Sequence, residues 1–203
     1  SKNSNPPSLD SLDSHKKLID LKKLDKEFKL DIRYASSNNF MRSKFYENER
    51  AFFHICAADR LIEAKNDLKE LGYGIIIYDA YRPWFITKMF WEGTPENLKH
   101  FVANPENGSS HNKGCAIDIG LYDIETGESV IMISGYDEFT ERAYPNYLGG
   151  SKRQRDIRDM LIKVMEKNDF TVYEYEWWHF NYNKCDSGIM NYSFSELDSL
   201  NSV

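Results

Sequence analysis

The chain has 203 residues, enough for one domain or at most two small ones. Hydrophobic residues at 41% and charged residues at 29% are ordinary globular values, which excludes a disordered or fibrous chain. The net charge of −6 does not favour a polyanionic partner, so nucleic acid is not expected as a partner.

The cysteines and the apolar runs set further limits. Three cysteines, an odd number without CxxC spacing, predict neither a disulfide framework nor a four-thiolate zinc site, and Cys56 is expected to be a small buried helix residue. No apolar run approaches the roughly 20 residues of a membrane helix, so no transmembrane segment is expected. Because the sequence begins with Ser1 rather than Met, removal of a preceding segment by processing or cloning is expected.

The first part of the chain is polar and then weakly amphipathic. Residues 1–14 contain a Pro-Pro pair and no apolar period, which predicts a flexible arm. Residues 15–203 are expected to form a single domain. Within it, residues 15–30 show a short amphipathic pattern, and residues 31–34 are expected to form a short strand.

The middle of the chain carries the clearest patterns. Apolar residues recur at helical period over residues 51–71, and glycines follow at the expected end of that helix. Residues 74–78 contain three consecutive isoleucines and predict a buried strand. Pro83 suits the first turn of a helix over residues 84–91. Residues 92–110 predict a long surface connection, which in a compact domain is usually functional.

The second half of the chain is rich in sheet-forming segments. Residues 115–121 and 130–133, joined by a glycine-containing turn, predict a hairpin. A helix is expected over residues 154–167 and one aromatic strand over residues 170–182. This order favours an α+β fold, a small, mostly antiparallel sheet with helices packed around it.

Two segments contain polar residues that make little sense as packing. His111 lies in a loop, and Asp118 lies within an apolar strand, where an unpartnered carboxylate is costly. In a second segment, Glu176 and His179 are three residues apart among aromatic residues. Two histidines and an aspartate form a three-ligand set for zinc that leaves a fourth position for water, and Glu176 would then be the general base. Since residues three apart in a regular strand point to opposite faces, a turn, a bulge or the start of the strand is expected between them.

A third segment, Tyr81-Arg82-Pro83, directly follows the buried strand. The guanidinium of Arg82 could stabilise an oxyanion or bind a substrate carboxylate. The alternatives are a surface ion pair for Arg82, core packing for at least one of Trp177 and Trp178, and approach of Cys115 to the metal.

These motifs together resemble a known family. Ser-x-His-x-x-Gly-x-Ala-x-Asp over residues 109–118, the Glu-x-x-His segment and the upstream Asp79-Ala-Tyr-Arg-Pro83 run are similar to the zinc D-alanyl-D-alanine dipeptidases of the vancomycin-resistance type. These belong to a wider group with the D,D-carboxypeptidases of the cell wall and the hedgehog domain. The resemblance extends from about residue 31 to the aromatic strand and implies a hedgehog/D,D-peptidase-like fold.

The resemblance also implies roles for individual residues. It assigns His111, Asp118 and His179 as ligands of one Zn²⁺ per chain. It further implies Glu176 as the catalytic base, Arg82 as the stabiliser of the transition state, Ser109 as a substrate contact and Asp137 as the residue that holds the substrate ammonium group.

The implied activity is hydrolysis of the small dipeptide D-Ala-D-Ala by a zinc metallopeptidase. The nearest alternative is a D,D- or L,D-carboxypeptidase that trims peptidoglycan stem peptides, and a further one is a non-catalytic zinc-containing binding domain. The sequence leaves bacterial cytoplasm or periplasm and cell envelope open as locations, and it does not predict an oligomeric state.

Overall fold

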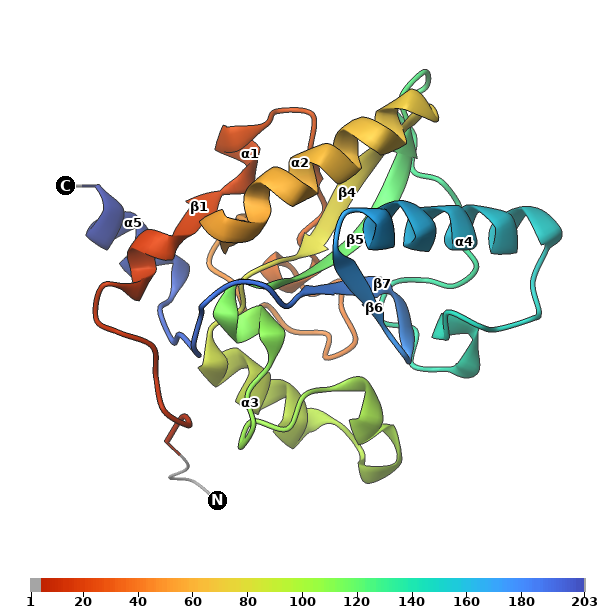
Figure 1. Cartoon of the computed structure of the whole chain (residues 1–203). Helices are drawn as coiled ribbons and strands as arrows, with labels where there is room; N and C mark the ends of the chain where they lie inside the picture. Colours follow the sequence, from red (N-terminus) through yellow and green to blue (C-terminus); the bar gives the residue numbers. More distant parts are fainter. Residues whose placement is uncertain (1–4, 203) are drawn as a thin grey trace.

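A computed structural model describes residues 5–202 and shows a central sheet with helices around it (Figure 1). The sheet has five strands. The strand order is β2-β4-β5-β7-β6, and only the β2–β4 pair is parallel. The mostly antiparallel sheet of an α+β fold is thus confirmed. The strands of this sheet are β2 (Lys29–Leu30), β4 (Tyr73–Asp79), β5 (Ala116–Asp123), β6 (Phe170–Tyr173) and β7 (Glu176–Tyr182). Two further strands, β1 (Leu18–Asp20) and β3 (Phe52–His54), form a separate antiparallel pair.

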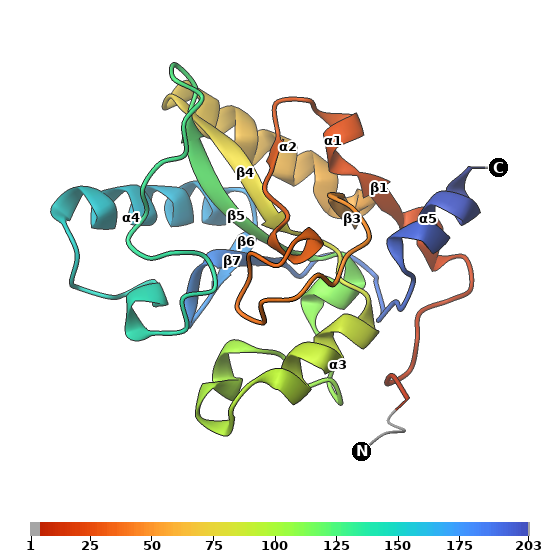
Figure 2. The same cartoon turned by 180° about the vertical axis from the view of Figure 1, so that it is seen from behind.

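Two long helices, α2 (Ile55–Glu70) and α4 (Lys152–Lys167), pack on the sheet, and α3 (Trp84–Gly93) lies apart from them in both views, beyond the sheet (Figures 1 and 2). Sequence determines where these helices begin and end. Ser151 and Gln154 form reciprocal side-chain to backbone hydrogen bonds that cap α4, and Gly72, at φ +91°, follows the end of α2. Two short helices complete the set, α1 (Leu21–Leu24) and α5 (Phe194–Asn201).

The region before β3 differs from the simple amphipathic pattern. Residues 15–30 are divided among a 3-10 turn, β1, α1 and β2, because β1 pairs with β3 and β2 pairs with β4. The strand expected over residues 31–34 is wrong. Residues 33–35 instead form a 3-10 turn, and the two residues before this segment pair with β4.

Two expectations for the second half also require correction. Residues 130–133 do not form a strand: beyond the Tyr122–Ser129 bridge the chain leaves β5, whose first three residues pair with β7. The single aromatic strand over residues 170–182 is two antiparallel strands, β6 and β7, joined by a tight turn at residues 174 and 175.

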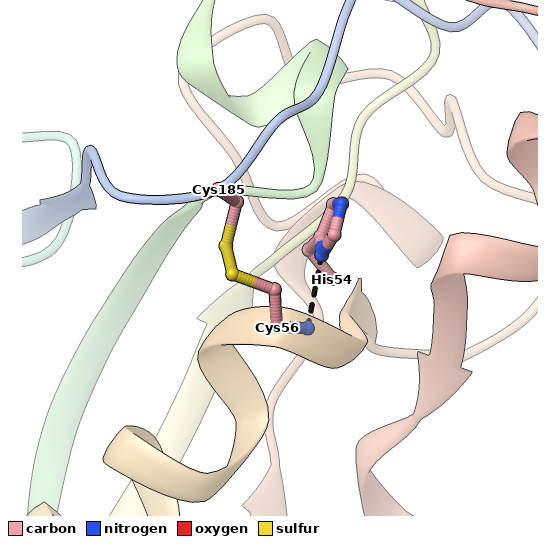
Figure 3. Close-up of side chains that lie close together, drawn as sticks. All are labelled: His54, Cys56 and Cys185. Carbon is pink, nitrogen blue, oxygen red and sulfur yellow. Dashed lines mark hydrogen bonds between the residues drawn. A yellow bond between two sulfur atoms is a disulfide. The ribbon is translucent and has the colours of Figure 1, made fainter.

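The prediction of a buried Cys56 that belongs to no disulfide is wrong. Cys56 and Cys185 form a disulfide with their Cα atoms 5.8 Å apart (Figure 3). Cys56 is exposed in the first turn of α2, where His54 Nδ1 accepts a hydrogen bond from its backbone amide at 3.0 Å. The two cysteines are 129 residues apart, so only the fold brings them together, and the odd count reflects the third residue, the free and buried Cys115.

The N-terminal segment is attached to the domain before residue 15. Leu9 forms a parallel bridge with Ile189, and the Asp10 carboxylate accepts hydrogen bonds from Lys17 and from the Gly188 amide. The flexible arm expected over residues 1–14 therefore lies partly outside the described residues, and its last part contacts the C-terminal segment. Within residues 5–202, no helix has both the length and the apolar character that crossing a bilayer requires.

Candidate metal centre

The sheet places a row of polar residues side by side on its three central strands. Asp79 on β4 pairs with Asp118 on β5, and Asp118 pairs with His179 on β7. Directly paired residues on neighbouring strands share one face of a sheet, so these three side chains point the same way. His111 reaches the same place from the 3-10 turn over Ser110–Lys113, which ends at Gly114 in the left-handed conformation, φ +69°.

The three sequence-predicted ligands meet. One ligand atom each from His111, Asp118 and His179 lie within 4.8 Å of one another. Asp118 Oδ1 is 3.2 Å from His111 Nε2 and 3.1 Å from His179 Nδ1. Burial by itself raises the pKa of Asp118, but the two imidazoles beside it hold that pKa well below its usual range. The cluster is therefore built around an ionised carboxylate.

Outer hydrogen bonds orient both imidazoles for metal binding. His111 Nδ1 is 2.7 Å from the Ala80 carbonyl oxygen, and His179 Nε2 is 2.8 Å from Asn181 Oδ1. Because both partners are acceptors, each of these outer nitrogens donates a proton to its partner, and the inner nitrogen, which faces Asp118, would present its lone pair to a metal ion on losing its own proton. Metal-binding histidines are typically fixed in this way, so the residues present fit a divalent ion such as Zn²⁺.

Glu176 lies beside the cluster because the β6–β7 hairpin is irregular. Glu176 is the first residue of β7, and the strand register shifts between Val172 and Tyr173 on β6. This provides the irregularity expected between Glu176 and His179, and Glu176 Oε1 lies 4.0 Å from His179 Nδ1. Burial, then the charges of Asp118 and Asp137, raise the pKa of Glu176 well above its usual value. A buried carboxyl with a raised pKa in a cleft is suited to accept and return a proton.

Arg82 is held by a buried ion pair. Its Nε and Nη2 both donate to Asp79 Oδ2, at 3.0 and 2.7 Å, and the Tyr46 hydroxyl donates to Asp79 Oδ1 at 2.5 Å. The guanidinium also lies 4.8 Å from the centre of the Phe90 ring. Asp79 and Tyr46 therefore fix the direction of Arg82, which is a buried partner rather than a member of a surface ion pair.

A cleft of about 230 Å³ opens onto these residues. It is smaller than the roughly 300–1,000 Å³ typical of sites for drug-sized ligands. Phe101, Val102 and Ala103, within the long connection over residues 92–110, line it, so this connection does contribute to the site. The cleft is lined by cluster residues and aromatic side chains, namely Tyr34, Phe40, Arg82, Phe90, Ser109, His111, Asp118, Asp137, Phe139, Tyr173, Glu176 and His179.

The two expected substrate contacts both line this cleft. Ser109 also has a local role, since its hydroxyl oxygen accepts a hydrogen bond from the His111 amide at 3.1 Å. Asp137 has φ +56° and accepts a hydrogen bond from the Tyr34 hydroxyl. Burial raises the pKa of Asp137 to about 8, although the Tyr34 hydrogen bond opposes the rise.

Several residues of the site were not recognised from sequence. Asp79 stood within the Asp79–Pro83 run and could have been found as a carboxylate three residues before a buried arginine. Tyr46 and Asn181 carry no local signal. Core packing, expected for at least one of Trp177 and Trp178, holds for both, since both are buried in the core. Burial raises the pKa of Cys115 to about 11, and no thiol belongs to the metal cluster within residues 5–202.

A buried His-Asp-His cluster beside a second carboxylate and a buried arginine, all opening onto a small cleft, defines a candidate metal-dependent hydrolase. The sequence matches the peptidase family M15, described as D-Ala-D-Ala dipeptidase, over residues 14–198. The chain belongs to this family, which confirms the resemblance and the enzyme class, a peptidase.

Individual relatives cover most of the chain. A D-alanyl-D-alanine dipeptidase of Escherichia coli (strain K12) is 30% identical over 163 residues, which cover 80% of this chain and 83% of that protein. One of Enterococcus faecalis (strain ATCC 700802 / V583) is 33% identical over 171 residues, covering 74% and 83%. A solved structure of the vancomycin-resistance D,D-dipeptidase VanXYg with a D-Ala-D-Ala phosphinate analogue is similar at 22% identity and a TM-score of 0.36, covering 75% of this chain and 56% of that one.

Proposed function

We propose that this chain hydrolyses the free dipeptide D-Ala-D-Ala with one Zn²⁺ held by His111, Asp118 and His179. The observation that carries the proposal is the convergence of these three side chains beside Glu176 in a small cleft. Two imidazoles and one carboxylate are a ligand set of catalytic zinc sites. When bound, the ion supplies Lewis-acid polarisation of the peptide carbonyl and lowers the pKa of water.

The chain's own residues account for the proton transfers and for charge stabilisation. Glu176 takes a proton from the attacking water and delivers it to the leaving amine, for which its buried position and raised pKa suit it. Arg82, directed by Asp79, stabilises the negative charge that develops on the carbonyl oxygen. This arrangement argues against a non-catalytic zinc domain, because a purely structural site needs no buried base.

The substrate is a small zwitterion, and the cleft contains a candidate partner for its ammonium group. Asp137 faces the cleft, and a bound ammonium would replace the proton that burial favours on this carboxyl. Ser109, two residues before His111, would provide a second contact with the substrate. Binding of a free amine by Asp137 favours a dipeptidase over a carboxypeptidase that acts on blocked stem peptides.

The mechanism is tested with Glu176→Gln and a matched control, Glu174→Gln, which changes an exposed carboxylate two residues earlier. We expect Glu176→Gln to bind Zn²⁺ with the wild-type stoichiometry of one and to lose at least 100-fold in kcat, about the contribution of a general base. Glu174→Gln should keep full activity. Wild-type hydrolysis by the Glu176→Gln variant, or activity that survives complete removal of the metal by a chelator, would contradict the mechanism.

Substrate class is tested by comparing D-Ala-D-Ala with its N-acetylated form and with L-Ala-L-Ala. The wild type should cleave only the free D,D-dipeptide, and Asp137→Asn should raise KM for it by at least tenfold. Faster cleavage of the acetylated substrate would instead indicate a carboxypeptidase.

Location is proposed from the disulfide. Structural disulfides form in oxidising compartments and are rare in the cytosol, so the Cys56–Cys185 bond favours periplasm or cell envelope over cytoplasm. Trapping free thiols with a maleimide in intact cells, followed by mass measurement, should leave both cysteines unmodified. Two modified cysteines would favour the cytoplasm.

A further inference from the structure

The hydroxyl group of Tyr136 contacts the metal cluster from outside the cleft. It donates a hydrogen bond to Asp118 Oδ2 at 2.6 Å, whereas the other oxygen, Oδ1, faces His111 Nε2 and His179 Nδ1. Tyr136 belongs to the irregular segment between β5 and α4 and is absent from the residues that line the cleft. The two oxygens of the Asp118 carboxylate therefore have separate partners.

Aromatic packing holds this hydroxyl in place. The Tyr136 ring stacks on Trp178, with ring centres 5.5 Å apart and planes at 20°, and meets the edge of Tyr78 at 4.5 Å and 71°. Trp178 is the chain neighbour of the ligand His179 and is fully buried. Ring pairs of this kind fix orientation as well as burying apolar area. The hydroxyl is thus positioned by the same strand that provides a ligand.

The segment also connects the cluster to Asp137, which lines the cleft. The Tyr136 hydroxyl lies 3.5 Å from the Tyr34 hydroxyl, which in turn donates to Asp137. Tyr136 contacts Asp118 while the next residue, Asp137, contacts Tyr34. Asp137 adopts φ +56° at this point, a conformation uncommon outside glycine. One short segment therefore supports Asp118 and presents Asp137.

We infer that Tyr136 is a positioning residue that holds Asp118 with a single oxygen facing the two histidines and thereby strengthens metal binding. The inference rests on the proposed metal centre. Without the hydrogen bond, the Asp118 carboxylate could rotate. The entropy lost in fixing its orientation would then weaken the binding of the metal. Outer partners of metal ligands typically contribute 10–100-fold in affinity, which sets the expected size of the effect.

The test is Tyr136→Phe, which removes only the hydroxyl, with Tyr78→Phe as the matched control. The control removes a hydroxyl from the ring that packs against Tyr136 but leaves the bond to Asp118 intact. Zinc affinity is measured by competition with a chromophoric chelator on metal-free protein. We expect the dissociation constant to rise about 10–100-fold for Tyr136→Phe and to stay within twofold of wild type for Tyr78→Phe.

A second measurement separates positioning from general destabilisation. The visible absorption of bound Co²⁺ reports coordination geometry, so it should change in Tyr136→Phe and not in Tyr78→Phe. Unchanged zinc affinity in Tyr136→Phe would overturn the inference. So would weaker binding with an unaltered Co²⁺ spectrum and a matching loss in the unfolding free energy of the metal-free protein. If His111→Ala binds zinc as tightly as wild type, the proposed metal centre itself fails, which is a distinct result.

Discussion

The disulfide between Cys56 and Cys185 should contribute a large part of the stability of this domain. The perturbation is the double variant Cys56→Ser/Cys185→Ser, which removes the bond without leaving a reactive thiol at either position. The bond closes a loop of 129 residues. Loop-closure entropy for such a length corresponds to about 5 kcal/mol at 25 °C, with measured effects more often about 2–4 kcal/mol. In a domain of this size, that predicts a melting temperature lower by about 5–20 °C.

The effect on activity should be smaller than the effect on stability. The segment after Cys185 is attached near the site by its own hydrogen bonds, from the Met190 amide to the Asn112 carbonyl at 2.9 Å and from the Trp84 amide to the Met190 carbonyl at 3.2 Å. These bonds remain in the variant. We therefore expect kcat/KM at 25 °C, well below the unfolding transition, to stay within about threefold of wild type, a change of less than 1 kcal/mol.

The assay is guanidinium unfolding of three samples: oxidised wild type, wild type with reductant, and the double variant. The last two should agree, because both lack the bond that the first contains. Cys115→Ala with and without reductant is the control for an effect of reductant at the free cysteine, and it should still respond to reductant. An oxidised wild type no more stable than the double variant, or two further free thiols by mass in the air-oxidised protein, would refute the reasoning.

Three further predictions concern the site and its supports. Asp79→Asn should cost about 3 kcal/mol of stability and at least tenfold in kcat/KM, because it leaves the Arg82 guanidinium buried without its countercharge; wild-type kinetics would show that Asp79 does not direct Arg82. In metal-free protein, the raised pKa of Asp137, about 8, means that the folded chain holds the proton more tightly than the unfolded chain. The unfolding free energy should therefore fall as pH rises from about 4 to 8, and Asp137→Asn, measured with chelator at pH 5 and 8.5, should flatten this fall; equal slopes would count against it. Gly114→Ala should cost at least about 1 kcal/mol, because φ is +69° and the new Cβ would lie 3.2 Å from the His54 amide nitrogen; Gly135→Ala, whose Cβ would meet open space, should leave the melting temperature unchanged.

The strongly periodic parts of the chain were predictable from sequence. Helices α3 and α4 and strand β4 lie where apolar period, capping residues and glycines indicate them, and α2 does so from Ile55 onward, because residues 52–54 of the expected helix form β3 instead. The segments that failed are short ones, such as residues 31–34 and 130–133. Their backbone conformation depends on which strand edge is available to pair with, and a local pattern does not contain that information.

The candidate site divides in a similar way. The candidate ligand and base residues were proposed from residue type and from the family resemblance, because a carboxylate in an apolar strand and an imidazole in an aromatic one need a partner to be tolerated. The residues that orient them did not follow. Tyr46 contacts Asp79 from 33 positions away, and Tyr136 contacts Asp118 from 18 positions away.

By itself, then, the sequence determined the secondary structure of the long elements, the family and the set of chemical groups available to the site. Only the tertiary structure decided which groups meet: the pairing of Asp79, Asp118 and His179 across three strands, the irregular hairpin that presents Glu176, and the disulfide between two cysteines that local spacing could not pair. The physical reason is that hydrophobic period and turn chemistry act over a few residues, whereas metal ligation, ion pairing and disulfide formation require atoms within a few ångströms, whatever their separation along the chain.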